Sequence, residues 1–403
     1  MRIALLVLIL LLQPLASFAD FEPNFTEYKG EFSLSSRIFP ESPLYSGQQH
    51  NNYSLSIEPE VYAEWSNNSN FVFKPFYRFD NEDSHRTHFD LREMQYSFYE
   101  DDWEANVGIG QVFWGVTESK NLVDIINQFD VVDDPLLKTK LGQPLFNVTL
   151  IRESGYFDFF ILPYFRERTN PGKKGRLRTD PHFIKNSTKF EGGSQWTPEL
   201  SMRWSNSFNS YDISLHSFIG YSRAPSINIK IIDGVINYVP NYQRIRQIGG
   251  TLQNTLESTL LKLEWIAKDG EKDSSFRRGG SFSSVIGLEH TLFQSFGDNG
   301  DLGFLFEYNF DSRKDKSPDV LQDDIFMAAR FSLNDSQNTE ILFGSIFDLD
   351  GDGQIYQLDF GQRLNDSLNL NVKGAIYQNG RLGSNLYILR QDSWFEVSLK
   401  QYF

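Results

Sequence analysis

The last ten residues of the chain alternate between apolar and polar side chains. Phe395, Val397 and Leu399 fall in one phase, and Glu396 and Lys400 fall in the other. Successive side chains of an extended strand point to opposite faces, so this period of two predicts a β-strand with one apolar and one polar face. In a soluble sheet the apolar face would cover a core. In a transmembrane barrel it would face lipid, and the polar face would line the lumen.

The same alternation recurs along the chain and predicts 18 strands. They cover about residues 28–39, 53–65, 71–79, 88–99, 103–109, 145–152, 156–166, 200–204, 211–215, 242–253, 259–265, 282–288, 302–310, 325–333, 341–347, 356–364, 368–376 and 394–403. A change of apolar phase between Leu91 and Met94 predicts a bulge. Pro59 and Pro75 predict local kinks, because Pro cannot donate to a strand ladder. Residues 222–241 are expected to be irregular.

The connections between these strands alternate in length. Short ones such as 67–70 and 153–155 alternate with long ones such as 114–144 and 167–196. This arrangement is typical of outer-membrane barrels, with short periplasmic turns, long extracellular loops and both chain ends on the periplasmic side. The competing interpretation is a soluble sandwich or propeller. The absence of a fixed repeat and the length of the strands argue against it. The predicted fold is therefore all-β, an antiparallel transmembrane β-barrel.

The start of the chain resembles a cleaved secretory signal. Arg2 precedes an apolar run from Ile3 to Leu12, and the small residues Ser17 and Ala19 follow. The run is shorter than the about 20 residues that a helix needs to cross a bilayer. We therefore expect residues 1–19 to be a signal peptide and residues 20–403 to form a single barrel domain in the cell outer membrane.

The composition of the chain excludes some classes of binding partner and binding site. The formal net charge of -15 argues against nucleic-acid binding by a basic surface. The chain has no Cys, which excludes disulfides and thiolate sites. We expect contact with outer-membrane lipid and lipopolysaccharide. Phe403 resembles the aromatic end of outer-membrane barrels that the barrel-assembly machinery recognises through the C-terminal strand.

The polar phase of the strands carries both signs of charge. The predicted lumen-facing residues are Glu58, Glu60, Glu64, Lys74, Arg78, Lys262, Glu264, Glu307, Arg330, Arg363 and Lys373, with Arg92, Arg203, Asp359, Glu396 and Lys400 in the same phase. Charges within a membrane-embedded sheet need water or partners, so this phase predicts a hydrated, mixed-charge lumen. A barrel of 18 strands is wide enough for an aqueous channel unless it is plugged. The sequence thus favours a porin-like channel for small polar solutes.

The long loop after residue 110 is expected to pack against the barrel wall. Val123, Ile126 and Phe129 recur at helical spacing within it. The loop follows Gly108-Ile-Gly110-Gln111-Val-Phe-Trp114-Gly115 and contains Asp124-Ile-Ile-Asn127-Gln-Phe-Asp130. This stretch resembles a motif of a family of uncharacterised proteobacterial outer-membrane barrels, although Gln128 stands where that pattern has Pro. The resemblance implies a porin-like barrel and supplies no substrate.

A second long loop is positively charged, whereas the chain as a whole is negatively charged. Between residues 166 and 189 it carries eight bases and two acids. The predicted basic loop residues include Arg166, Arg168, Lys173, Lys174, Arg176 and Arg178. Such a cluster attracts anionic solutes or lipopolysaccharide. A solvated loop that balances an acidic chain is the alternative.

The stretch from Asp348 to Asp359 resembles the calcium loop of EF-hand and dockerin proteins. The candidate ligands are Asp348, Asp350, Asp352, Gln354 and Asp359. Calcium needs six to eight oxygens, which this spacing can supply around a tight turn. The flanks read as strands, so an Asp-Gly hairpin turn is the alternative. No other cofactor is expected.

Catalysis has no support in the sequence. None of the six His residues lies in a recognisable nucleophile or metal motif, so no catalytic residues are predicted. An outer-membrane enzyme remains the rival functional class, and a non-conducting structural or adhesion barrel is a third.

Overall fold

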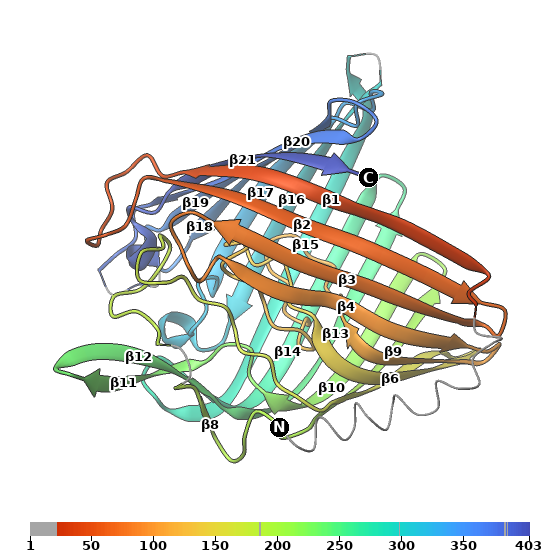
Figure 1. The fold of residues 1–403 in the computed structure, drawn as a ribbon, viewed down its shortest axis with the longest axis horizontal. Helices are drawn as coiled ribbons and strands as arrows, with labels where there is room; N and C mark the ends of the chain where they lie inside the picture. Colours follow the sequence, from red (N-terminus) through yellow and green to blue (C-terminus); the bar gives the residue numbers. More distant parts are fainter. Residues whose placement is uncertain (1–21, 185–186, 298, 383, 385) are drawn as a thin grey trace.

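The computed structural model describes residues 22–403 except 185–186, 298, 383 and 385. Its main feature is a closed antiparallel barrel of 18 strands (Figure 1). The predicted signal peptide, residues 1–19, lies outside the described residues. No helix in the described ranges is long and apolar enough to cross a membrane.

The wall strands follow one another in chain order. They are β1 (Phe25–Ile38), β2 (Asn51–Trp65), β3 (Ser69–Asp80), β4 (His88–Tyr99), β5 (Trp103–Gly110), β6 (Gln143–Arg152), β7 (Gly155–Leu162), β9 (Glu199–Phe208), β10 (Tyr211–Tyr221), β13 (Arg244–Leu256), β14 (Thr259–Lys272), β15 (Arg278–Phe296), β16 (Gly300–Asp311), β17 (Asp323–Ser332), β18 (Glu340–Asp348), β19 (Gln354–Arg363), β20 (Leu368–Gln378) and β21 (Trp394–Tyr402). Two 3₁₀ helices, η1 (Lys314–Lys316) and η2 (Leu386–Leu389), lie in loops. The 18 predicted strands are therefore confirmed.

The barrel closes where its first and last strands meet. β1 and β21 pair antiparallel from Glu31 opposite Tyr402 to Ile38 opposite Phe395 (Figure 1). The backbone of Gly30 continues the ladder to Phe403, the last residue. The alternating C-terminal strand is thus one side of the seam.

Two local predictions have different outcomes. The predicted bulge is confirmed, because the β3–β4 register shifts where Lys74 pairs with Glu93 and Pro75 with Leu91. The expectation that residues 222–241 are irregular is wrong. They form a hairpin of β11 (Ser226–Ile232) and β12 (Val235–Tyr242), which β8 (Lys189–Phe190) extends to three strands.

The hairpin turn explains this correction. Asp233 and Gly234 both have positive φ, at 50° and 78°. An Asp-Gly pair tolerates this conformation and favours a tight turn between two strands. Figure 1 places the small sheet beside the end of the barrel that carries the long loops.

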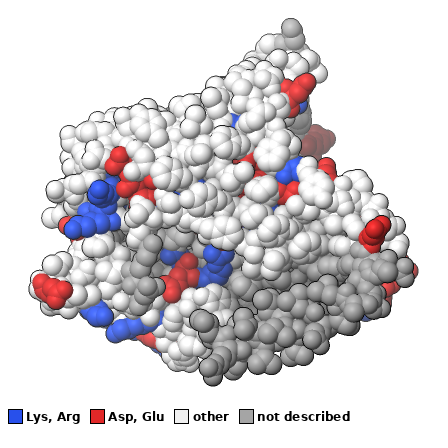
Figure 2. Space-filling view, in the orientation of Figure 1, with Lys and Arg blue, Asp and Glu red and all other residues white. Residues whose placement is uncertain are grey.

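The outer and inner faces of the wall differ as the alternation requires. Apolar side chains such as Phe89 and Leu34 are 62% and 54% exposed on the outside. Figure 2 shows one face of the molecule, on which uncharged residues predominate and charged residues form small groups. The buried clusters include residues of the inner wall and of loops that enter the barrel, such as Val123 and Ile126. The interior is therefore partly filled by loop residues.

Candidate functional site

The segment between β5 and β6, Gln111–Gly142, enters the lumen, and we call it the strap. Val123 and Ile126 are each 1% exposed and pack in one cluster with Phe160 of β7 and Phe218 of β10. The predicted packing of this loop against the wall is confirmed. The helical spacing of these residues does not correspond to a helix, because the strap, all of whose residues the structure describes, contains no α-helix or 3₁₀ helix.

One part of the strap is held by two buried carboxylates of the wall. Glu264 of β14 accepts hydrogen bonds from the backbone N–H groups of Val116 and Thr117, at 2.6 and 3.0 Å. Glu307 of β16 accepts hydrogen bonds from the N–H groups of Glu118 and Ser119, at 2.7 and 2.8 Å. Glu264 and Glu307 are each at most 1% exposed. Their burial is compensated because each satisfies several donors of the strap.

A later part of the strap is held by arginines of other strands. Arg78 of β3 lies 2.7 Å from the carboxylate of Asp133, and Arg92 of β4 lies 2.9 Å from that of Asp130. Arg37 of β1 donates to the backbone oxygen of Asp133 at 3.0 Å. The strap is therefore tied to β14 and β16 at one point and to β1, β3 and β4 at another.

The arginines also set the charge state of this anchor. Burial by itself would raise the pKa of Asp133, but Arg78, Arg92 and Arg86 outweigh it and hold that pKa well below its usual range. Asp133 is therefore ionised at neutral pH, and its side chain is only 13% exposed. A buried carboxylate with several guanidinium partners makes a strong, directional contact.

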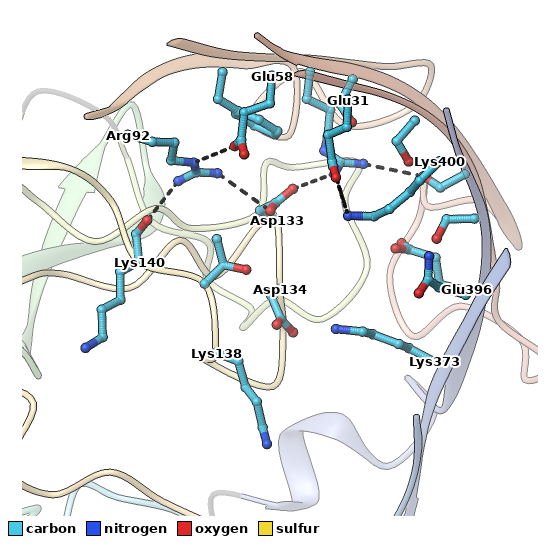
Figure 3. Close-up of a pocket in the computed structure, with 18 of the residues that line it drawn as sticks. Glu31, Glu58, Arg92, Asp133, Asp134, Lys138, Lys140, Lys373, Glu396 and Lys400 are labelled. Atoms are coloured by element: carbon cyan, nitrogen blue, oxygen red, sulfur yellow. Dashed lines mark hydrogen bonds and ion pairs between the residues drawn. The ribbon is translucent and has the colours of Figure 1, made fainter. Parts of the chain in front are cut away.

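A cavity of about 400 Å³ lies between the strap and the wall near the seam. The wall strands β1 to β4, β20 and β21 contribute most of the lining, and the strap contributes Gln111, Phe113, Asp133, Asp134, Lys138, Thr139 and Lys140. Figure 3 shows Lys138 and Lys140 extending from the strap, with Lys373, Glu396 and Lys400 extending from β20 and β21 around the same space. The cavity is thus lined by both signs of charge.

The predicted lumen-facing residues fall into several groups. Those that line the cavity are Glu58, Lys74, Arg78, Arg92, Lys373, Glu396 and Lys400. Glu264 and Glu307 hold the strap, while Lys262 and Arg330 pair with Glu289. Glu60 pairs with Lys29 and Lys74, Arg203 with Asp158, and Asp359 with Lys373.

The structure does not bring every predicted residue to the cavity. Glu64 lies beside the short turn after β2, opposite Asn70. Arg363 donates to the backbone oxygen of Ser336 in an exposed position. Both therefore lie near the short-turn end of the barrel.

Sequence reasoning missed several lining residues. Glu31 and Arg37 lie in the polar phase of the first strand, so alternation was a sufficient signal for them. Asp133, Lys138 and Lys140 belong to the strap, which has no strand period. Nothing in the sequence indicates that they face β1 or β20.

The basic loop is only partly a solvated surface. Arg176 forms a buried ion pair with Asp392, 2.6 Å apart, and Arg178 pairs with Asp180 at 3.2 Å. Arg166 pairs with Asp90, and Arg168 is half-buried. Lys173 and Lys174 are exposed. Arg166 and Arg176 therefore attach the loop to β4 and to the segment before β21, while Arg178 pairs within the loop.

The possible calcium loop forms the hairpin turn between β18 and β19. Asp348 accepts hydrogen bonds from the N–H groups of Asp350 and Gly351, each at 3.0 Å. Asp359 lies within β19, opposite Leu342, and pairs with Lys373. The described residues contain no group of three or more His, Asp or Glu side chains arranged to hold a metal ion.

Calcium binding at this turn stays a prediction. Asp359, the predicted ligand at the twelfth position, lies in β19 and pairs with Lys373 instead. A calcium titration of the parent chain against Asp350→Ala tests it. If both chains bind calcium with equal affinity, Asp350 is not a calcium ligand and the proposed site at the hairpin turn is ruled out.

Comparisons with known proteins identify the fold alone. No protein-family model matches the chain, and no curated protein matches it. Among solved structures, Pseudomonas aeruginosa OccK5 (OpdH) is similar with a TM-score of 0.52 and 8% identity over 94% of this chain and 98% of that chain. Two others have lower scores. The outer membrane protein OmpT of Vibrio cholerae has 0.47 at 7% identity, over 94% and 99% of the chains. A mutant porin of Rh. blastica has 0.42 at 9% identity, over 94% and 100%.

The likeness to OccK5 shows the barrel fold and says nothing of a solute. The resemblance of residues 108–130 to a family of uncharacterised barrels stays a prediction.

Proposed function

We propose that the chain is an outer-membrane channel that passes small polar solutes. The observation that carries this proposal is the strap, which is tied to two separate parts of the wall and leaves a charged cavity beside it. A strap that merely sealed the barrel would not need a charged lining. Charged side chains at this depth need water or partners, and a hydrated passage supplies the water.

The position of the strap supports selectivity. A barrel of 18 strands encloses a wide interior. The strap reduces that interior to narrower spaces with fixed charges along their walls. Fixed charges in a narrow passage raise the local concentration of ions of opposite sign. The passage therefore favours polar solutes and discriminates among them by charge.

The side chains on the outer face of the barrel indicate which molecules surround it. Apolar side chains on the outer face suit lipid, and the exposed Lys173 and Lys174 suit the anionic groups of lipopolysaccharide. We also propose that Phe403, at the end of the seam, is the residue that the barrel-assembly machinery contacts. Nucleic acid is not a proposed partner.

Single-channel recording of refolded residues 20–403 in a planar bilayer tests the proposal. We expect discrete conductance steps. Lys138→Glu should shift ion selectivity toward cations, because the side chain lines the cavity and is 46% exposed. The matched control Lys230→Glu lies on the exposed hairpin and should leave selectivity unchanged.

A folded barrel that never conducts would overturn the proposal in favour of a structural or adhesion barrel. Hydrolysis of ester or peptide substrates by the refolded chain would favour an enzyme instead.

A further inference from the structure

Phe113 of the strap is an exposed aromatic ring in a charged cavity. It is 60% exposed, whereas Phe76 and Trp394 in the same lining are 5% and 1% exposed. The ammonium of Lys140 lies 4.0 Å from the centroid of the Phe113 ring. This cation–π contact explains the position of Lys140, but it leaves most of the ring in contact with the cavity. An exposed ring of this kind provides a surface for an apolar group.

Positive charge predominates in the same lining. Eight basic and five acidic side chains line the cavity, in a chain whose formal net charge is -15. The most accessible bases are Lys138 and Lys373, whose side chains are 46% and 38% exposed. Lys138 pairs with Glu118, and Lys373 lies 3.6 Å from Asp359. Exposed ion pairs of this kind contribute little, so an incoming anion can replace the protein carboxylates.

The carboxylates of the lining are already engaged. Asp133 lies between Arg78 and Arg92, and Glu396 pairs with Arg37 and Arg86. Glu58 pairs with Lys74, and Glu31 with Lys400. Asp134 is 8% exposed and accepts a hydrogen bond from the N–H of Leu136. The four ion-paired carboxylates have side chains that are 13–23% exposed, against 46% and 38% for Lys138 and Lys373, so the two lysines are the more accessible charges.

The accessible groups face one space from two sides. Phe113 comes from the strap. Lys138 also comes from the strap, while Lys373 and Lys400 come from β20 and β21 (Figure 3). The volume of about 400 Å³ lies within the range of small-molecule sites, about 300–1,000 Å³. The ring and the lysines therefore belong to the lining of one cavity of a size that suits a small molecule.

We propose that this cavity binds a small organic anion with a flat apolar body. Its acidic group pairs with Lys138 and Lys373, and its apolar body lies against Phe113. The inference deepens the proposed function by assigning a solute class to the same cavity. Binding at equilibrium does not depend on conduction, so the two proposals are tested separately.

Calorimetric titration of the refolded chain in detergent, against a protein-free detergent blank, tests the site. The probes are benzoate, acetate, which lacks the ring, and benzylammonium, which reverses the charge. We expect benzoate to bind at least tenfold more tightly than either. Phenyl phosphate, added in parallel, tells whether a carboxylate or a phosphate is preferred. Equal binding of benzoate and benzylammonium would overturn the proposal.

Matched variants assign the effect to the cavity. Phe113→Ala should weaken benzoate binding about tenfold, whereas Phe276→Ala, at a loop residue that is 63% exposed, should not. Lys138→Gln with Lys373→Gln should weaken it by at least the same factor, whereas Lys230→Gln should not. If Phe113→Ala binds benzoate like the parent chain, the site is elsewhere and the proposal fails.

The two proposals fail in different ways. A chain that conducts ions but does not bind benzoate would contradict the solute class and leave the channel in place. A chain that binds benzoate with the expected variant pattern but never conducts would contradict the channel and leave the binding site in place.

Discussion

Arg37 on the first strand donates a hydrogen bond from Nε to Oε2 of Glu396 on the last strand, at 2.8 Å. The two residues are directly opposite in the register that closes the barrel. Their side chains are 6% and 15% exposed. The seam is therefore closed by a largely buried ion pair as well as by its backbone ladder.

We predict that Arg37→Gln destabilises the folded barrel by about 3 kcal/mol, because it leaves Glu396 buried with Arg86 as its remaining cation. Urea unfolding in lipid vesicles measures this change. Lys400→Gln is the control at the same seam. Its pair with Glu31 is more exposed, at 32% and 23%, so its loss should cost at most about 1 kcal/mol. Equal losses for both variants would mean that burial of the pair is unimportant.

The carboxylate of Glu264 should control the mobility of the strap. We predict that Glu264→Gln weakens this anchor by about 1–3 kcal/mol, because an amide group replaces one acceptor oxygen and the charge is lost. Amide hydrogen exchange at Val116 and Thr117 should then be about tenfold to a hundredfold faster. Mass spectrometry of strap peptides measures it. Glu60→Gln, which breaks only the pairs with Lys29 and Lys74, should leave these rates unchanged.

The apolar contact of the strap should add to its polar anchors. Ile126 is 1% exposed and packs in a cluster with Phe160 and Phe218. We predict that Ile126→Ala costs about 2–4 kcal/mol through lost packing and a residual cavity. Leu122 is only partly buried at the edge of the same cluster, so Leu122→Ala should cost less. Unfolding in vesicles compares them, and a larger loss for Leu122→Ala would place the packing centre elsewhere.

The wall of the barrel was predictable from the sequence, because one rule generates it. Alternation fixes both the position of a strand and the face of each residue. The inward position of Lys373 and the outward position of Phe89 both follow from it. The missed hairpin also carried a local signal, since Asp233-Gly234 between runs of Ile and Val favours a tight turn.

The strap was not predictable in the same way. Val116 contacts Glu264 across 148 positions of sequence, and no periodic pattern connects them. The basic loop shows the same limit. Its composition indicates an exposed cluster, yet Arg176 is buried against Asp392, 216 positions away. Contacts between a loop and a distant strand depend on how the closed barrel places them, which local patterns do not encode.

The depressed pKa of Asp133 predicts how the strap responds to acid. A group whose pKa is lowered by folding contributes stability that is fully present above its unfolded pKa, about 4, and that is lost as the pH falls toward the folded value. The difference in unfolding free energy between the parent chain and Asp133→Asn should therefore be constant from pH 7 to about pH 5. It should shrink steadily below about pH 4, because protonation then removes the same charge in the parent chain.

Urea unfolding of both chains in vesicles across this pH range measures that difference. Asp102→Asn is the control, because its side chain is 67% exposed and pairs weakly with Arg152. That variant should differ little from the parent at any pH. A difference for Asp133→Asn that stays constant down to pH 2 would show that Arg78 and Arg92 hold the strap by shape and hydrogen bonding rather than by the charge of Asp133.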